Sequence, residues 1–241
     1  MSADLNLDHL QETVRTLCGW GCHVLPLAPG ETTPITETGF KDATSDVTTA
    51  LARFSHGRLN IGIATGPSKL VVVYGDGEAG NVWLANAHDT YGIPPTFTVR
   101  TRAGGFHYYF KAPEGIEIKC SAGRIAPGID IRAEGGYVVG PTSWVDADKK
   151  GPAGWYRVID DSPVAPLPEW LLHLLLASQA RPTRRPLPVS DVEAAKLLGI
   201  SRAGLHRFVR QGLIPKPFKL GRRSLYRVAD LRACVDRLAT P

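Results

Sequence analysis

Residues 70–80 read LVVVYGDGEAG, and this stretch decides how the first part of the chain is interpreted. The β-branched apolar run at residues 71–73 is typical of a buried strand, and the glycines that follow it indicate a turn. Two carboxylates, Asp76 and Glu78, stand at the mouth of that strand. Their placement suggests a metal site, yet Tyr74 holds the position where the strand ends. A neutral phenol is a poor ligand for a hard divalent cation.

Apolar and alternating runs on both sides of this stretch indicate further strands, with a few helical patterns between them. Strands are expected at residues 22–27, 60–65, 96–101, 107–112, 129–133 and 136–141. Helices are expected at residues 4–18, 48–54, 80–92 and 168–178. Clusters of strands separated by a few helices indicate an α+β fold, with helices packed against a mixed sheet.

Charge is distributed unevenly along the chain. The 241 residues carry a formal net charge of +5, but residues 179–241 hold 14 Lys and Arg against 4 Asp and Glu, whereas residues 1–178 hold 14 against 19. Residues 177–188, rich in proline and arginine, are predicted to be a linker. We therefore predict one domain at residues 1–176 and a second at residues 189–241 that faces a polyanion.

Composition argues against several classes of protein. The apolar runs fall short of the roughly 20 residues that a membrane span requires, and the first residues lack the basic and apolar regions of a signal peptide. The four cysteines are scattered, with no CxxC pair and no zinc spacing, which is typical of thiols in a reducing compartment. We expect a cytoplasmic protein with no membrane partner.

The second domain begins with the most regular pattern in the chain. Ser190 followed by Glu193 forms a capping-box pattern at the start of a helix, and Gly199 ends that helix. Ser201 can cap a second helix. The buried face of the first helix would consist of Val192, Ala195 and Leu198. The buried face of the second would consist of Leu205, Phe208 and Val209. Two short helices with a glycine turn between them indicate a helix-turn-helix.

This pattern resembles the small winged helix-turn-helix domains of phage excisionases and MerR-like regulators. Two short strands around Gly221 would form the wing, and residues 229–238 would form a closing helix. In such domains the second helix enters the major groove and the wing follows phosphates. The resemblance implies DNA contacts at Arg202, His206, Arg207, Arg210, Arg222 and Arg223. A basic helical hairpin used for protein contact is the alternative.

Six fragments of the first domain, in order, resemble the primase-polymerase (prim-pol) domain of phage and plasmid replication proteins, a member of the archaeo-eukaryotic primase superfamily. They are GWGCHVLPLAPG, GFKDATSD, NIGIATG, LVVVYGDGEAG, TRAGGFHYYFKAP and PGIDIRAEGGYVVGPTS, and the likeness runs from about residue 17 to residue 175. It implies a mixed-sheet domain that transfers nucleotides from nucleoside triphosphates on a single-stranded DNA template. Two cations, Mg²⁺ or Mn²⁺, about 3.5 to 4 Å apart, would support this chemistry.

The resemblance also implies roles for particular residues. The catalytic positions match Asp76, His107 and Asp130, and the two aspartates would bind metal. The nucleotide-binding positions match Lys41, Gly104, Gly105, His107 and Arg132. Plainer alternatives stay open for three of these residues. His107 could be a structural histidine of a strand, Asp130 could cap a turn, and Arg132 could be a surface charge.

The departure from the family lies at Tyr74, where the family has the first carboxylate of a metal-binding pair. Asp76 is then the only remaining member of that pair. A bulge at Gly75 could shift the register so that Asp76 and Glu78 form the pair and Glu78 becomes catalytic. Without such a bulge, two-cation catalysis would be severely weakened.

Three functions remain open on the sequence. The first is a DNA-binding prim-pol-like protein of a mobile element (phage, prophage or plasmid), acting as a DNA primase and polymerase if active. The chain has no GxxxxGK[ST] loop, so a separate helicase would be its partner. The second is a catalytically degenerate homologue that binds nucleic acid or regulates. The third is a transcription or excision regulator in which the first domain is a scaffold.

Overall fold

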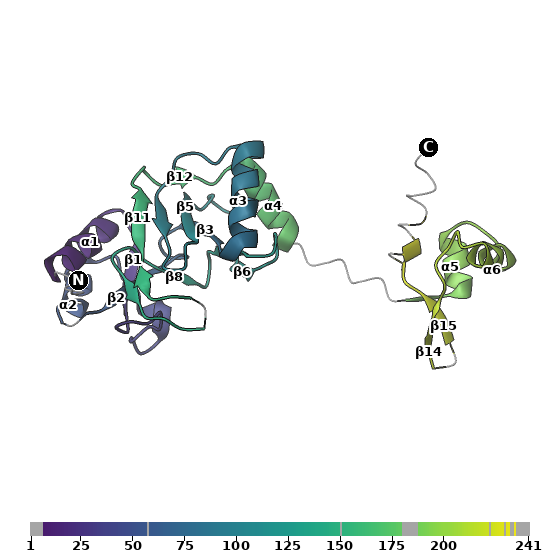
Figure 1. The fold of residues 1–241 in the computed structure, drawn as a ribbon, viewed down its shortest axis with the longest axis horizontal. Coiled ribbons are helices and arrows are strands. Elements are labelled where there is room, and N and C mark those ends of the chain that lie inside the picture. Colours follow the sequence, from purple (N-terminus) through teal and green to yellow (C-terminus); the bar gives the residue numbers. More distant parts are fainter. Residues whose placement is uncertain are drawn as a thin grey trace. The chain divides into compact units, whose positions relative to one another are not determined.

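The computed structural model describes residues 7–56, 58–149, 151–179, 188–221 and 223–228, together with residues 230, 231 and 234. Contacts divide the chain into two compact units, Met1–Gln179 and Ala180–Pro241. Helix α4 (Glu169–Gln179) closes the first unit (Figure 1). This helix corrects one predicted boundary, because the first three residues of the expected linker, 177–179, are helical.

A mostly antiparallel sheet forms the centre of the first unit, with the strand order β11-β4-β5-β3-β7-β6. These strands are β3 (Leu70–Gly75), β4 (Thr98–Arg100), β5 (Phe106–Lys111), β6 (Ser121–Ala122), β7 (Ile129–Arg132) and β11 (Arg157–Asp160). Strand β12 (Ala165–Pro166) adds a parallel pairing to β5. Residues 70–75 therefore form an inner strand of the sheet, which is paired on both sides.

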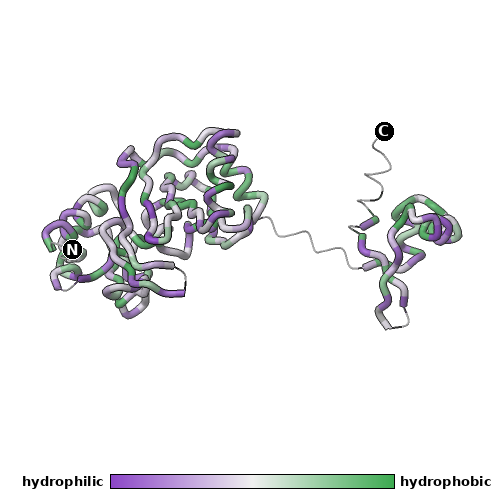
Figure 2. The backbone as a smooth tube through the Cα atoms, in the orientation of Figure 1, coloured by the Kyte–Doolittle hydropathy of each residue, from purple (hydrophilic) through white to green (hydrophobic). Residues whose placement is uncertain are grey.

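Alternation along β3 buries side chains on both faces of this sheet. Val71 and Val73 pack with α3 (Gly77–Tyr91) and α4 on one face, whereas Val72 belongs to the core on the other face. Because successive residues of a strand point to opposite faces, a continuous apolar run is needed when both faces are covered. Figure 2 shows hydrophobic residues along α4, which covers the face of Val71 and Val73.

The second face of the sheet packs on a smaller antiparallel sheet and two helices. The small sheet has the order β1-β2-β8. Its strands are β1 (His23–Leu27), β2 (Asn60–Ala64) and β8 (Tyr137–Val139). Helices α1 (Leu7–Gly19) and α2 (Val47–Arg53) cover this side. Figure 1 shows them on the side of the unit away from α3 and α4.

Several short elements of the first unit were not expected from the sequence, among them strands β6, β11 and β12. Residues 39–42 form a 3-10 turn, η1 (Gly39–Asp42). Strands β9 (Trp144–Val145) and β10 (Gly154–Trp155) form a hairpin whose tryptophans pair across the two strands. Strands of two residues are too short for an alternating pattern to reveal them.

The second unit contains the predicted helix-turn-helix. Helix α5 (Asp191–Leu197) begins with the capping box of Ser190 and Glu193, and α6 (Arg202–Arg210) is capped by Ser201. The wing consists of β14 (Phe218–Leu220) and β15 (Arg223–Tyr226). Strand β13 (Val189–Ser190), which the sequence did not predict, pairs with β15. The closing helix expected at residues 229–238 lies mostly outside the described residues.

One prediction about the core of this unit is wrong. Val192 was expected to be buried, but it is 59% exposed. Ala194 and Ala195 form the buried face of α5 together with Leu205 of α6. Small side chains let two short helices approach closely, so the contact is made through the alanines and not through Val192. None of the helices among the described residues has the length and apolar character of a membrane span.

Candidate functional site

Tyr74, His107 and Asp130 form one row across three neighbouring strands. Tyr74 on β3 pairs directly with His107 on β5 and, on its other side, with Asp130 on β7. Directly opposed residues of antiparallel strands project to the same face of a sheet. The structure therefore brings two of the predicted catalytic residues together, with a tyrosine between them.

No bulge shifts β3 out of this register. Pairing with β5 is continuous from Leu70 to Gly75, and pairing with β7 continues through Gly75. The register shift proposed from the sequence is thus wrong. Asp76 lies just beyond the strand, exposed, and its backbone N–H donates to the carbonyl oxygen of Gly128 at 2.8 Å. Glu78 lies in the first turn of α3 and is also exposed.

The Tyr74 phenol is neutral in this setting. Burial raises its pKa, and the neighbouring Asp76 carboxylate and Tyr156 phenol raise it further. A strongly raised pKa means that the hydroxyl keeps its proton throughout the physiological range. Tyr74 can donate or accept a hydrogen bond, but it brings no negative charge to the row.

His107 is buried among aromatic rings and is uncharged. It is 5% exposed, and its ring lies 4.8 Å from that of Tyr74 and 5.7 Å from that of Tyr156. Burial lowers the pKa of His107 to about 3, with Arg132 adding to the effect. Its Nδ1 atom has no hydrogen-bond partner in the part of the chain that the structure describes. A buried nitrogen without a partner is costly unless something else satisfies it.

Asp130 already has partners for both of its carboxylate oxygens. Arg132 Nη2 donates to Oδ2 at 3.1 Å, and the Gly123 backbone N–H donates to Oδ1 at 3.2 Å. The ion pair is partly exposed, with 34% of the Arg132 side chain and 24% of the Asp130 side chain accessible. Arg132 shares the face of Asp130, as two residues of one strand should. Asp130 is therefore not a free carboxylate ligand in this structure, because both of its oxygens already accept hydrogen bonds.

A two-cation centre does not fit the side chains present. Within the described ranges no three His, Cys, Asp or Glu side chains converge as metal ligands. Tyr74 is neutral where a bridging carboxylate would be required, and Asp130 is engaged by Arg132. The cation predicted at Asp76 and Asp130 stays a prediction.

The predicted nucleotide-binding residues are only partly brought together. Arg132 and His107 face the same side of the sheet, whereas Lys41 lies exposed on η1. Gly105 is buried, and a Cβ atom there would lie 2.3 Å from the carbonyl oxygen of Gly75. The absence of a side chain at Gly105 therefore serves the close approach of β3. Gly104 has a φ of +85°, which favours glycine in its turn.

Sequence reasoning missed the residues that surround this row. Thr101 and Tyr156 both influence the Tyr74 phenol, and the Thr101 hydroxyl accepts from the Gly105 backbone N–H at 3.1 Å. Neither residue type marks a metal or nucleotide site by itself. Tyr156 lies between β10 and β11 (Arg157–Asp160), so no strand pattern in the sequence marks it as buried.

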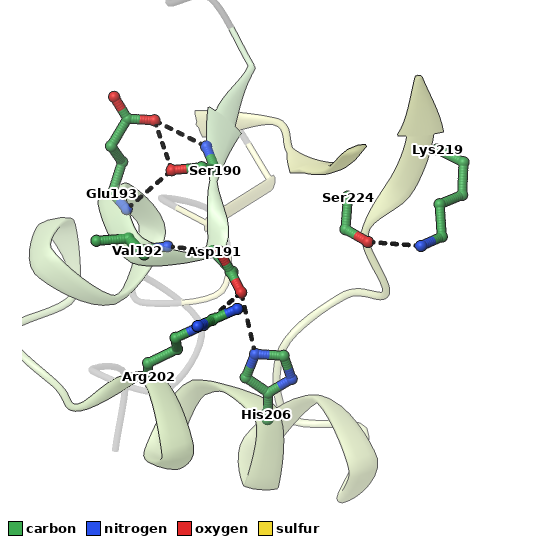
Figure 3. A network of polar contacts seen from close by, with 8 residues as sticks. All are labelled: Ser190, Asp191, Val192, Glu193, Arg202, His206, Lys219 and Ser224. Atoms are coloured by element: carbon green, nitrogen blue, oxygen red, sulfur yellow. Dashed lines mark hydrogen bonds and ion pairs between the residues drawn. The ribbon is translucent and has the colours of Figure 1, made fainter. Parts of the chain in front are cut away.

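The helix-turn-helix carries exposed Arg and His side chains, some of which have hydrogen-bond partners among the described residues and some of which do not. Arg202 Nε and His206 Nε2 lie 2.6 Å and 3.3 Å from Asp191 Oδ2 (Figure 3). Arg207 lies against the Phe208 ring at 5.1 Å, and Arg210 has no bonded partner among the residues the structure describes. Arg223 is exposed at the start of β15. Arg222 lies outside the described residues.

Comparison with known families agrees with both units. The family model described as bifunctional DNA primase/polymerase, N-terminal, matches residues 15–170. A helix-turn-helix domain model matches residues 191–238. No curated protein matches the chain. The first match spans the row of Tyr74, His107 and Asp130, and the second spans both helices and the wing. Together they support a DNA-associated, primase-polymerase-like protein.

Proposed function

This chain belongs to the bifunctional DNA primase/polymerase family through its N-terminal domain, and from that premise we propose that it is a catalytically degenerate member. Its prim-pol domain would bind single-stranded DNA and nucleoside triphosphates without efficient transfer. Its helix-turn-helix domain would bind a duplex site.

The unbroken register that places Tyr74 between His107 and Asp130 carries this proposal. Two-cation nucleotidyl transfer needs converging carboxylates to neutralise charge at the attacking and leaving oxygens. Here a protonated phenol stands at the centre of the row, and Asp130 is paired with Arg132. The match to the primase/polymerase family model over residues 15–170 supports the retained part of the function.

The test is primer synthesis and extension on single-stranded DNA with labelled dNTPs and rNTPs in the presence of Mn²⁺. We compare the unaltered chain, Asp130→Ala, Tyr74→Asp, and Tyr74→Asp combined with Asp130→Ala. Tyr74→Phe is the matched control, because it alters the same side chain without adding a carboxylate. The unaltered protein and Tyr74→Phe should give no product.

If Tyr74→Asp gives product and the double variant does not, the prim-pol domain is intact except for one missing carboxylate. Efficient product from the unaltered chain, lost with Asp130→Ala alone, would overturn the proposal of degeneracy. DNA binding is measured in parallel by fluorescence anisotropy, so that loss of chemistry can be separated from loss of binding.

Template-directed nucleotidyl transfer is the second candidate function. Two observations favour it. His107 and Asp130 lie on the same face of the sheet, and Asp76 lies close to Tyr74, which stands between them. On this reading those three residues would act with Mg²⁺ or Mn²⁺ on nucleoside triphosphates. The same extension assay decides between the two candidates.

The cellular setting is also part of the proposal. A prim-pol domain joined to a small helix-turn-helix domain suits replication or maintenance of a mobile element such as a phage, prophage or plasmid, in the cytoplasm. A separate helicase would supply unwinding. Pull-down from cells carrying the element, with and without nuclease treatment, would show whether a helicase associates directly or only through DNA.

A further inference from the structure

Two arginines face each other at the edge of the central sheet without any acidic partner. Arg157 on β11 pairs directly with Arg100 on β4, and both are exposed. Neither has a hydrogen bond or ion pair to another residue among those described. Like charges directly opposed across two strands destabilise a sheet. Such a pair is readily explained if an anion from outside lies between them.

Two tryptophans stand beside this pair on the hairpin of β9 and β10. Trp144 and Trp155 are opposed across the hairpin, and their rings meet edge to face at 5.2 Å. Trp144 Nε1 donates to Asp146 Oδ1 at 2.9 Å, which orients its indole. Both side chains are partly exposed, so part of each remains available to a ligand.

A buried arginine holds the hairpin against the turn that follows β4. Arg102 donates to the carbonyl oxygens of Gly151 and Pro152 and forms an ion pair with Asp148. Its own side chain is only 5% exposed. Because the guanidinium is rigid and bonds three acceptors of the hairpin, it fixes the tryptophans relative to the opposed arginines.

These residues line a cavity of about 320 Å³ that neighbours the Tyr74 row through Thr101. The lining residues are Arg100, Thr101, Arg102, Gly104, Trp144, Gly154, Trp155 and Arg157. Val99 pairs with His107 and shares its face, whereas Arg100 pairs with Phe106. By strand alternation, Arg100 and Arg157 project to the opposite face of the sheet from His107.

We propose that this cavity is a binding site for single-stranded nucleic acid, with bases stacked on Trp144 and Trp155 and a backbone phosphate held by Arg100 and Arg157. Cationic grooves with aromatic platforms bind single strands in this way, because every base has a π face and every linkage a negative charge. A cavity at a sheet edge leaves the strand free to continue on both sides. The assignment rests on the proposed function, since it locates the single strand that the prim-pol domain would bind.

The first experiment is photocrosslinking of the full chain to a 15-residue oligo(dT) that carries 5-bromodeoxyuridine. Excess unlabelled duplex is added to occupy the helix-turn-helix, and crosslinked peptides are identified by mass spectrometry. The expected peptide contains Trp144 or Trp155. Crosslinks found only within residues 189–241 would overturn the site, while leaving the proposed DNA association in place.

The second experiment measures affinity for the same oligonucleotide by anisotropy at several salt concentrations. Trp155→Ala should lower affinity at least about fivefold, and Trp155→Phe should restore most of it. Arg100→Ala combined with Arg157→Ala should reduce the slope of log affinity against log salt by about 0.7, the value for the one phosphate that the two arginines hold. Arg15→Ala, which removes an exposed charge from α1, is the control and should change affinity little.

The remaining outcomes separate this inference from the proposed function. If the arginine and tryptophan variants bind oligo(dT) like the unaltered chain, the site is wrong and the proposed function stands. If dTTP alone displaces the oligonucleotide from the cavity at equal concentration of nucleotide units, the site belongs to a mononucleotide and the inference is wrong. If the unaltered chain binds neither single-stranded nor duplex DNA, both proposals fail together.

Discussion

Tyr74 lies directly opposite His107, and its ring meets the imidazole edge to face at a centroid distance of 4.8 Å and an interplanar angle of 88°. This contact occupies the place where catalysis by two cations needs a carboxylate beside the histidine. Edge-to-face aromatic pairs stabilise a fold by about 0.5–1.5 kcal/mol beyond the area they bury. Tyr74 and His107 therefore pack as an aromatic pair, and burial explains why His107 is neutral.

Tyr74→Asp should increase affinity for Mn²⁺ by about tenfold or more, equivalent to about 1.4 kcal/mol. The substitution adds a carboxylate close to Asp76 and beside Asp130, and like charges in one place favour a cation. Isothermal titration calorimetry measures the change, with Tyr74→Phe as the control that adds no charge. Equal Mn²⁺ affinity in all three proteins would mean that these strands cannot form a cation site.

Folding stability should depend on pH through His107. Its pKa is about 3 in the folded protein and about 6.5 in an unfolded chain. Between these values the unfolded chain binds the extra proton, so stability is present above about pH 6.5 and is lost as the pH falls toward 3. The free energy of unfolding should change by at most about 1.4 kcal/mol per pH unit through this one group.

Urea unfolding of the unaltered chain and of His107→Phe at pH 5 and pH 7.5 measures how much His107 contributes to the pH dependence of stability. The stability lost on acidification should be smaller in His107→Phe. His173→Gln, which alters an exposed histidine of α4, is the control and should behave like the unaltered chain. Identical pH dependence in all three would contradict a buried neutral His107.

Gly105→Ala should destabilise the first unit by about 1–3 kcal/mol. A Cβ atom at this position would lie 2.3 Å from the carbonyl oxygen of Gly75, so either β3 or the turn has to move. Thermal unfolding followed by circular dichroism measures the loss. Gly19→Ala, which has no atom within 4 Å of the added Cβ, should be near neutral. A normal melting temperature for Gly105→Ala would show that the turn yields easily.

Asp191→Asn should strengthen binding of duplex DNA by several fold. Asp191 holds Arg202 and His206 through one carboxylate oxygen, and removal of its charge frees both side chains for phosphates. Arg210→Ala should weaken binding and reduce the salt slope by about 0.9, because a partnerless cation is the best candidate for a phosphate contact. Anisotropy titrations over a range of salt measure both effects. Weaker binding by Asp191→Asn would mean that the Asp191 contacts position the recognition helix.

The elements with local signals were predictable from the sequence. The apolar run of β3, the cap formed by Ser190 and Glu193, and the glycine turn between α5 and α6 all appear where they were expected. The exposure of Val192 could not be read from periodicity, since small alanines decide where the two helices touch. Strands β9 and β10 went unpredicted because two residues carry no pattern.

The sequence showed which residue types belong to the site, but it did not show which of them contact one another. Asp130 and Arg132 were correctly placed on one strand face, because strand alternation is local. Their ion pair, the burial of His107 and the involvement of Tyr156 depend on which strands become neighbours. The opposed pair of Arg100 and Arg157 is of the same kind, since the two residues come from strands far apart along the chain.

By itself, the sequence determined the two kinds of domain, the basic character of the second, and the presence of a tyrosine where the family has a carboxylate. Only the tertiary structure decided that no bulge compensates for that tyrosine, because strand register depends on pairing with β5 and β7 on both sides. The same pairing brings Tyr74 against His107 and leaves Glu78 on a helix. Local preferences select strands and helices, whereas the packing of distant segments decides which side chains meet.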